Sequence, residues 1–286
     1  QDTVVATLGS HSIRRMTITA AQLDNANLDK AFQFYKDSFA DAGGFTFTIV
    51  GNIDEGQIKP LLEKYLGGLP ATHKNETYKN LGIHAPAGQI TKNVYKGIGD
   101  KSTVQLVFSG DYDYNDFNNL QVDALEEILN IKLIERLREN GVGVSSPGVR
   151  AGYSKIPSGR YRLTVSFTCA PANVDKLINA TMEEIANIKQ NGASPTDIEK
   201  FAAEEKRSTE VQLKENNFWA AYLVGSSQNA ENPDKILDHV KELSKVTVQT
   251  TKDAANKYLG GNNLIKLILY PETKKSYALQ IRALHM

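Results

Sequence analysis

Cysteine is nearly absent from the sequence, and long runs of apolar residues are absent altogether. The single cysteine, Cys169, excludes an internal disulfide and a zinc site built from several thiolates, so we expect it to be a small core side chain in a strand. No apolar run approaches the roughly 20 residues that a membrane-spanning helix needs, which excludes membrane insertion. The sequence also begins at Gln1 without a methionine or a signal-like segment, and we interpret it as a processed product or an excised portion of a longer chain.

An excess of charge of either sign is also missing. Lys and Arg together number 33, and Asp and Glu together also number 33. Without a net positive field, neither nucleic acid nor an anionic membrane surface is an expected partner. The hydrophobic share of 41% and the charged share of 23% are typical of a globular protein, and 286 residues suffice for one large domain or two smaller ones.

The spacing of apolar residues predicts helices and strands along most of the chain. Residues 71–100 are instead rich in Gly, Pro, Lys, Asn and Thr, and we interpret them as an interdomain linker. The order of elements after this linker predicts an α+β unit in which helices cover one face of an antiparallel sheet. The expected strands are 45–50, 102–108, 149–155, 160–168 and 264–269. The expected helices run from 19 to the glycines at 43 and 44, then over 55–65, 115–140, 173–191, 194–214, 216–226, 235–243 and 246–258.

The segment from Leu133 to Pro147 changes from a long amphipathic helix to a strand. Gly141 is typical of the position that closes a helix with a positive φ. Arg138 projects from the last helical turn, where it either faces a substrate or complements the helix dipole as cations near helix C-termini do. The paired acids Glu126-Glu127 and Glu204-Glu205 lie on charged helical faces, and we expect them to be solvated.

Four passages of the sequence carry a family resemblance when they are taken together. They are residues 34–54, Tyr65-Leu-Gly-Gly-Leu-Pro70, Gly97-Ile-Gly-Asp-Lys-Ser102, and Leu137-Arg-Glu-Asn-Gly-Val-Gly-Val-Ser-Ser-Pro147 with Cys169-Ala-Pro-Ala-Asn-Val174 downstream. These passages are similar to the insulinase and pitrilysin family of zinc peptidases, most closely to its bacterial pitrilysin-like members. The similarity covers most of the chain from about Thr19 onward.

The resemblance implies a fold, partners and a location. Family members have two halves of two related α/β domains each, and the halves close around an unfolded peptide. By this resemblance, residues 1–70 are the C-terminal part of a preceding peptidase-like domain, 71–100 are the linker, and 101–286 are a complete C-terminal domain of the mitochondrial-processing-peptidase type. The implied partners are the N-terminal half of the same peptidase and an unfolded peptide substrate, and the implied location is the periplasm.

The zinc motif of the family is missing from this sequence. The family binds zinc in its N-terminal half through an inverted His-x-x-Glu-His motif and a distant Glu, because the chemistry needs neutral imidazoles, a carboxylate ligand and a base beside the metal-bound water. The nearest approach here is His239-Val-Lys-Glu242, which is followed by Leu243 instead of a second His. We therefore expect no metal ligand and no cofactor in this chain, with zinc bound in the N-terminal half of the parent protein. The histidines are His11, His73, His84, His239 and His285.

The C-terminal half of the family contributes, by resemblance, an Arg and a Tyr seven positions apart that hold the substrate or the developing oxyanion. Arg138 fits the first position, and Ser145 stands where the Tyr is expected. Cationic and phenolic donors suit this role because they stabilise the charge that grows on the attacked carbonyl. Tyr153 is close enough in sequence to replace the missing Tyr, although an aromatic residue in a strand more often serves packing.

Two hypotheses on function follow from these observations. In the first, the chain is the C-terminal portion of a zinc-dependent metalloendopeptidase, which contributes substrate binding and chamber closure and is inactive alone. In the second, it is a non-catalytic scaffold or protein-interaction module that keeps the peptidase fold, as Ser145 in place of Tyr suggests. An intact zinc motif upstream in the parent chain distinguishes the first from the second.

Overall fold

The computed structural model describes residues 2–72, 77–139 and 145–272; the side chains of 138, 139, 145 and 146 are not described. The chain divides into two units, each of which is treated separately below. The larger unit consists of Gln1–Met16, Gly82–Lys206 and His239–Met286, and the smaller one of Thr17–Leu81 and Arg207–Asp238. No helix within the described ranges is long and apolar enough to cross a membrane.

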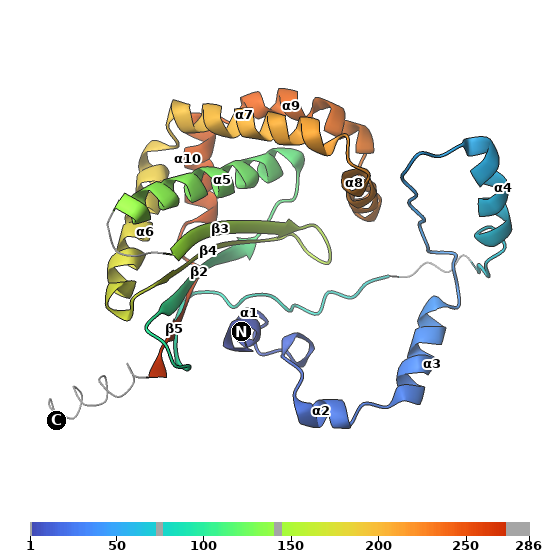
Figure 1. The fold of residues 1–286 in the computed structure, drawn as a ribbon, viewed down its shortest axis with the longest axis horizontal. Coiled ribbons are helices and arrows are strands. Elements are labelled where there is room, and N and C mark those ends of the chain that lie inside the picture. The colour runs from blue at the N-terminus through green and yellow to red at the C-terminus, as the bar shows by residue number, and fades with distance from the viewer. Residues whose placement is uncertain (1, 73–76, 140–144, 273–286) are drawn as a thin grey trace. The chain divides into compact units, whose positions relative to one another are not determined.

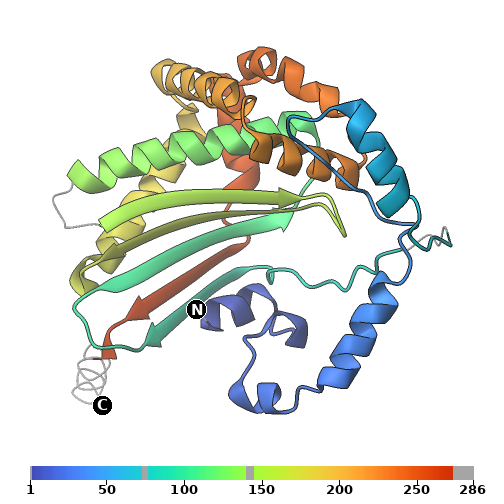
Figure 2. The same cartoon turned by 45° about the vertical axis from the view of Figure 1, so that its right-hand side comes forward.

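The larger unit is built on a five-stranded sheet with the order β1-β5-β2-β4-β3 (Figure 2). Three pairings, β2 with β4, β2 with β5 and β3 with β4, are antiparallel as predicted, whereas β1 pairs with β5 in parallel. Strand β1 was not predicted and lies inside the segment 71–100 that we interpreted as a linker. The other four strands are confirmed. The strands are β1 Gln89–Tyr95, β2 Ser102–Asp111, β3 Ser145–Ser154, β4 Arg160–Cys169 and β5 Leu264–Tyr270.

Helices α5, α6 and α10 cover one face of this sheet, and α1 lies against the opposite face (Figure 1). Helices α7 and α9 lie on the side of α5 that faces away from the sheet (Figure 1). This arrangement confirms the predicted α+β class with its main helical layer on one face. The bounds are α1 Asp2–Leu8, α5 Asp116–Glu139, α6 Val174–Asn191, α7 Pro195–Gln212, α9 His239–Glu242 and α10 Val248–Tyr258.

The core lies between α5 and the sheet. Alternate residues of β2 and β4 point to this face, because side chains along a strand point to opposite faces in turn. Helix α5 presents apolar residues at every fourth position, a spacing that places them on one side of a helix. Cys169 is a buried core side chain in β4, as predicted. The buried residues of this layer include Val104, Leu106, Phe108, Leu125, Leu129, Leu133, Leu137, Leu163, Val165 and Phe167.

The smaller unit contains the predicted helices but not the predicted strand. Helix α4 spans Glu55–Tyr65 and is capped by Asp54. The region predicted as one helix from residue 19 forms two, the short α2, Ala20–Asp24, and α3, Leu28–Phe39. The cap at Asn27 begins α3 and so separates it from α2. Helix α8 spans Asn216–Asn229. The prediction of a strand over residues 45–50 is wrong for the described chain, because no strand is there to pair with it. The apolar side chains of this alternating segment are instead exposed: Phe45 41%, Phe47 49% and Ile49 45%.

Candidate functional site at the α5–β3 connection

Arg138 and Ser145 lie on opposite sides of one connection. Arg138 is in the last turn of α5, and Ser145 is the first residue of β3, where it is in register with Thr168 of β4. Residues 140–144 between them, with the predicted helix-closing Gly141, lie outside the described residues. The roles that the family resemblance implies for Arg138 and Ser145 therefore stay predictions.

Helix α5 runs toward this connection, and strand β3 runs back from it beside the helix in the opposite direction (Figure 1). Asp123 Oδ2 accepts a hydrogen bond from the Tyr153 hydroxyl at 3.0 Å. One helical turn later, Glu126 Oε2 accepts from the backbone N–H of Ala151 at 2.8 Å. Asn130 Oδ1 then accepts from the N–H of Val149 at 3.1 Å. These three contacts align the helix with the strand between Asp123 and Asn130, and the last of them lies about two helical turns before Arg138.

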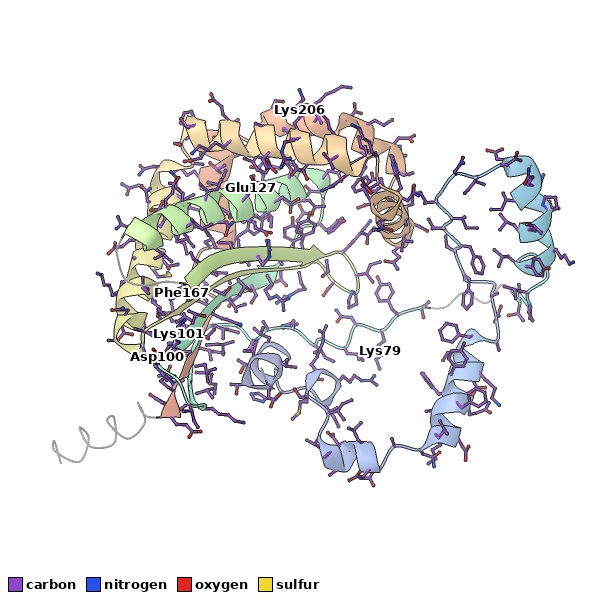
Figure 3. The ribbon with its side chains drawn as sticks, in the orientation of Figure 1. Lys79, Asp100, Lys101, Glu127, Phe167 and Lys206 are labelled. Carbon is purple, nitrogen blue, oxygen red and sulfur yellow. The ribbon has the colours of Figure 1, made fainter. Side chains whose placement is uncertain are left out.

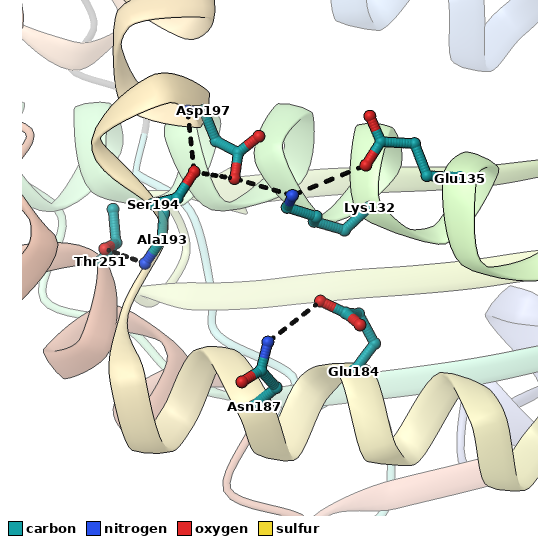
Figure 4. Close-up of polar contacts among 8 residues, drawn as sticks. All are labelled: Lys132, Glu135, Glu184, Asn187, Ala193, Ser194, Asp197 and Thr251. Carbon is teal, nitrogen blue, oxygen red and sulfur yellow. Dashed lines mark hydrogen bonds and ion pairs between the residues drawn. The ribbon is translucent and has the colours of Figure 1, made fainter.

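Ion pairs fix the C-terminal half of α5 to the start of α7 (Figure 4). Lys132 Nζ lies 2.9 Å from Asp197 Oδ2 and 3.6 Å from Glu135 Oε2. Ser194 caps α7, because its Oγ accepts from the N–H of Asp197 at 3.2 Å, and its hydroxyl donates to Asp197 Oδ2 at 2.5 Å. Burial alone raises the pKa of Asp197, but hydrogen bonds from Ser194 and Lys132 outweigh it and hold that pKa below its usual value. The carboxylate therefore stays charged at neutral pH.

A second ion pair and a backbone contact add to this arrangement. Arg136 Nη2 lies 3.0 Å from Glu183 Oε2 of α6, on the exposed surface one turn before the end of α5. The N–H of Ala193, just before α7, donates to Thr251 Oγ1 of α10 at 2.9 Å (Figure 4). Helix α5 is thus held by side chains from β3, α6 and α7, which are rigid elements that can position a residue at its end.

Tyr153 belongs to a cluster of tyrosines against the core. Its ring stacks on that of Tyr112, with centroids 5.5 Å apart, and meets Tyr114 edge-on at 5.8 Å. Burial, followed by the negative charge of Asp123, raises the pKa of Tyr153 well above its usual value, so the phenol is neutral and its proton is engaged with Asp123. These contacts agree with the packing interpretation of Tyr153.

His239, which begins the partial zinc motif His239-Val-Lys-Glu242, forms an ion pair. Its Nε2 lies 2.8 Å from Glu205 Oε1 of α7, and this contact, opposed by burial, raises the pKa of the imidazole. His84 Nδ1 lies 3.0 Å from the carbonyl oxygen of Ala85, whereas His73 and His285 lie outside the described residues. Within residues 2–72, 77–139 and 145–272, no three His, Cys, Asp or Glu side chains are grouped so that they could hold a metal ion.

The prediction that the paired acids are solvated is wrong for Glu126 and Glu127. The Glu126 carboxylate is engaged with β3 through Ala151 and Arg150. Glu127 lies on the side of α5 that faces α7 (Figure 3). Desolvation by burial, followed by the charges of Glu205, Glu204 and Glu126, raises the pKa of Glu127 to about 7.

A family model described as the Peptidase M16 inactive domain matches residues 25–204, which is more than half of the chain. The chain belongs to this family. A zinc protease PQQL-like protein of Arabidopsis thaliana is 28% identical over 233 residues, covering 74% of this chain and 24% of that protein. The chain thus spans about a quarter of the length of the curated relatives it matches.

Solved structures share the fold of this M16 inactive-domain chain. The periplasmic protease PqqL from Escherichia coli matches with a TM-score of 0.77 and 20% identity over 90% of this chain and 29% of that chain. The first half of the same protease also matches, with a TM-score of 0.65 and 21% identity over 89% of this chain and 55% of that one. At these identities the likeness shows the fold alone.

The contacts that hold α5 had few signals in the sequence. Ser194-Pro-Thr-Asp197 has the spacing of a capping motif, which indicates the helix start but not the partnership of Asp197 with Lys132. Glu126 and Asn130 are four residues apart and so share a helical face, yet nothing in the sequence shows that this face meets β3.

Proposed function

We propose that this chain is a non-zinc-binding portion, in the C-terminal half, of a zinc-dependent metalloendopeptidase of the M16 family. It contributes substrate contacts and closure of the chamber, and it hydrolyses nothing alone. The observation that carries this proposal is the match of residues 25–204 to the M16 inactive domain. The absence of an inverted His-x-x-Glu-His motif from the sequence supports it.

The other half of the parent protein would hold the zinc, which would supply Lewis-acid activation of the scissile carbonyl and of the attacking water. The contribution of this chain is Arg138, whose guanidinium donates hydrogen bonds to the substrate backbone or to the oxyanion that develops on the attacked carbonyl. Ser145, at the position of the family Tyr, has a shorter side chain and contributes a weaker contact through a bridging water. The partners are accordingly the zinc-binding half and an unfolded peptide.

The division into domains is part of the same proposal. Residues 1–70 form the end of a preceding peptidase-like domain, 71–100 connect it, and 101–286 form the C-terminal domain, whose sheet is completed by β1, Gln89–Tyr95, from the connecting segment. The exposed apolar side chains of Phe45, Phe47 and Ile49 support this division, because a strand of this pattern needs the rest of its sheet to be covered. The periplasm is the proposed location, since the E. coli relative is described as a periplasmic protease.

The decisive experiment compares Arg138→Ala with native protein in the full-length parent, using turnover of an unstructured fluorogenic peptide. We expect a loss of roughly a hundredfold or more, as for removal of an oxyanion contact. The matched control is Lys176→Ala, which removes an exposed cation from α6. Turnover of the Arg138 variant within about twofold of native protein would contradict the role of Arg138. Cleavage of the peptide by this chain alone, abolished by a chelator, would contradict the assignment as a non-zinc-binding portion.

The scaffold hypothesis remains the second candidate, and Ser145 in place of Tyr is the observation that favours it. It predicts that the upstream half of the parent protein has a degenerate zinc motif. Zinc content of the purified full-length protein, measured by atomic emission, separates the two: about one zinc per chain supports the peptidase, and no zinc supports the scaffold.

A further inference from the structure

Among the described residues, strand β3 is an edge strand, because it pairs only with β4 at one end of the sheet order. The edge of a sheet normally presents unpaired N–H and C=O groups, to which another extended chain can add as a further strand. The other edge of this sheet, in the part of the chain that the structure describes, is β1, which pairs only with β5. Both edges can therefore pair with another extended chain unless their outward N–H and C=O groups are already hydrogen-bonded.

Two outward N–H groups of β3, those of Val149 and Ala151, are occupied by side chains of helix α5. The amide of Ala151 donates to Glu126 Oε2 at 2.8 Å and that of Val149 donates to Asn130 Oδ1 at 3.1 Å, so neither is directed at β4. Pro147, two residues before Val149 in the same strand, has no N–H to offer. Over residues 147–151, every donor that could serve an incoming strand is either absent or already used.

The spacing of the two side chains matches the spacing of the two amides. Four residues of an α-helix rise by about 6 Å, and two residues of a strand by about 6.6 Å. Residues four apart on α5 can therefore serve amides two apart on β3 without distortion. The match explains why Glu126 and Asn130 can both bind at once.

The Glu126 carboxylate is held in this position from two sides. Its Oε2 accepts from Ala151, while Oε1 lies 3.3 Å from Nη1 of Arg150, on the same strand. The Glu126 side chain is 23% exposed and that of Arg150 is 88% exposed, so the arginine lies over the carboxylate from the solvent side. A charged acceptor of this kind makes a stronger hydrogen bond to an amide than a neutral one.

We propose that Glu126 and Asn130 close the β3 edge of the sheet to strand addition, so that an extended peptide backbone cannot pair with residues 147–151. The closure is a property of this chain and does not depend on peptidase activity in the parent protein. In a peptide-binding parent it restricts where an unfolded substrate is held. Removal of the two acceptors opens the edge and permits pairing.

The first test is amide hydrogen exchange, resolved by residue, on the 286-residue chain. Glu126→Ala speeds exchange at Ala151 by tenfold or more and leaves Val149 protected, whereas Asn130→Ala does the reverse. Each single variant thus has its own amide as the readout, and the other amide reports that the strand is still folded. Unchanged exchange at the matching amide in either variant overturns the closure.

The second test uses a probe peptide, acetyl-Lys-Thr-Val-Thr-Val-Thr-Lys-amide, and follows its protection of the amides of residues 147–153. The double variant E126A/N130A is expected to bind the probe at this strand at least tenfold more tightly than the native chain. The matched control is E126Q/N130D, which keeps both acceptor oxygens and the native net charge and should exclude the probe as the native chain does. Probe pairing with β3 of the native chain, or no gain in the double variant, overturns the proposal.

Discussion

Lys132 Nζ lies 2.9 Å from Oδ2 of Asp197, whose side chain is only 2% exposed. This pair joins the middle of α5 to the first turn of α7, and Ser194 donates a further hydrogen bond to the same carboxylate oxygen. Buried charges are stable only when they are paired and hydrogen-bonded. The pair therefore fixes α5 to α7 at a point six residues before Arg138.

Lys132→Met should lower the free energy of unfolding by about 2–3 kcal/mol, because it leaves the buried carboxylate of Asp197 without its cation. Urea unfolding at pH 7, followed by circular dichroism, measures the change. Glu183→Gln is the control, since it breaks the exposed pair with Arg136 and should cost less than about 0.5 kcal/mol. Equal losses for the two variants would show that burial of Asp197 is unimportant.

The pH dependence of the same pair has a defined sign. The folded-state pKa of Asp197 is lowered, so its stabilising contribution is present above the usual carboxylate pKa and is lost as the pH falls through the lowered value. The pKa of Lys132 is raised, chiefly by its hydrogen bond to Asp197, so its contribution is lost only at strongly alkaline pH. The difference between native protein and Lys132→Met should therefore be constant near neutrality and shrink in strong acid.

Glu127→Gln should stabilise the protein at and above neutral pH. The folded-state pKa of Glu127 is raised to about 7, so the folded chain keeps this proton between pH 4.5 and 7 while the unfolded chain loses it, and stability falls as the pH rises through that window. A neutral amide avoids the repulsion from Glu204 and Glu205, and we expect a gain of about 1–2 kcal/mol at pH 8. Thermal unfolding at pH 4 and pH 8 checks this, and a gain of equal size at both values would contradict the charge explanation.

His239 should titrate above the usual imidazole value because of its contact with Glu205. A raised folded-state pKa means that the ion pair stabilises the fold fully below about pH 6.5 and that this contribution is lost as the pH rises through the folded value. NMR titration of the His239 ring in native protein and in Glu205→Gln measures the shift directly. The variant should lower the pKa, whereas an unchanged pKa would show that Glu205 is not the cause.

Strands with an apolar face could be predicted from the sequence, whereas β1 could not. Strands β2 and β4 alternate because one face lies on the core, and α5 is marked by its regular leucines. Strand β1, Gln89–Tyr95, lies at the edge of the sheet and is mostly exposed, so its polar composition resembles that of a linker. The segment 45–50 shows the opposite case, because its alternation is that of a strand but a strand requires a partner within the chain.

The candidate site was predictable only where a motif supports it. Arg138 and Ser145 were identified by family resemblance, and the structure places them on either side of one connection. The contacts that hold this region, such as Glu126 with the amide of Ala151, join residues 25 apart in the sequence. Their formation depends on how α5 packs on the sheet, which the local pattern of residues does not contain.

Restoring the family tyrosine tests the site from the other direction. Ser145→Tyr in the full-length parent should raise the turnover of an unstructured peptide by about tenfold or more, because a phenol is a longer and more acidic donor that can reach a developing oxyanion directly. Tyr153→Phe is the matched control, since the Tyr153 hydroxyl is engaged with Asp123 and its loss should change turnover by less than about threefold. If Tyr153→Phe instead abolished turnover and Ser145→Tyr had no effect, Tyr153 would be the substrate-binding tyrosine, and the assignment of position 145 would be wrong.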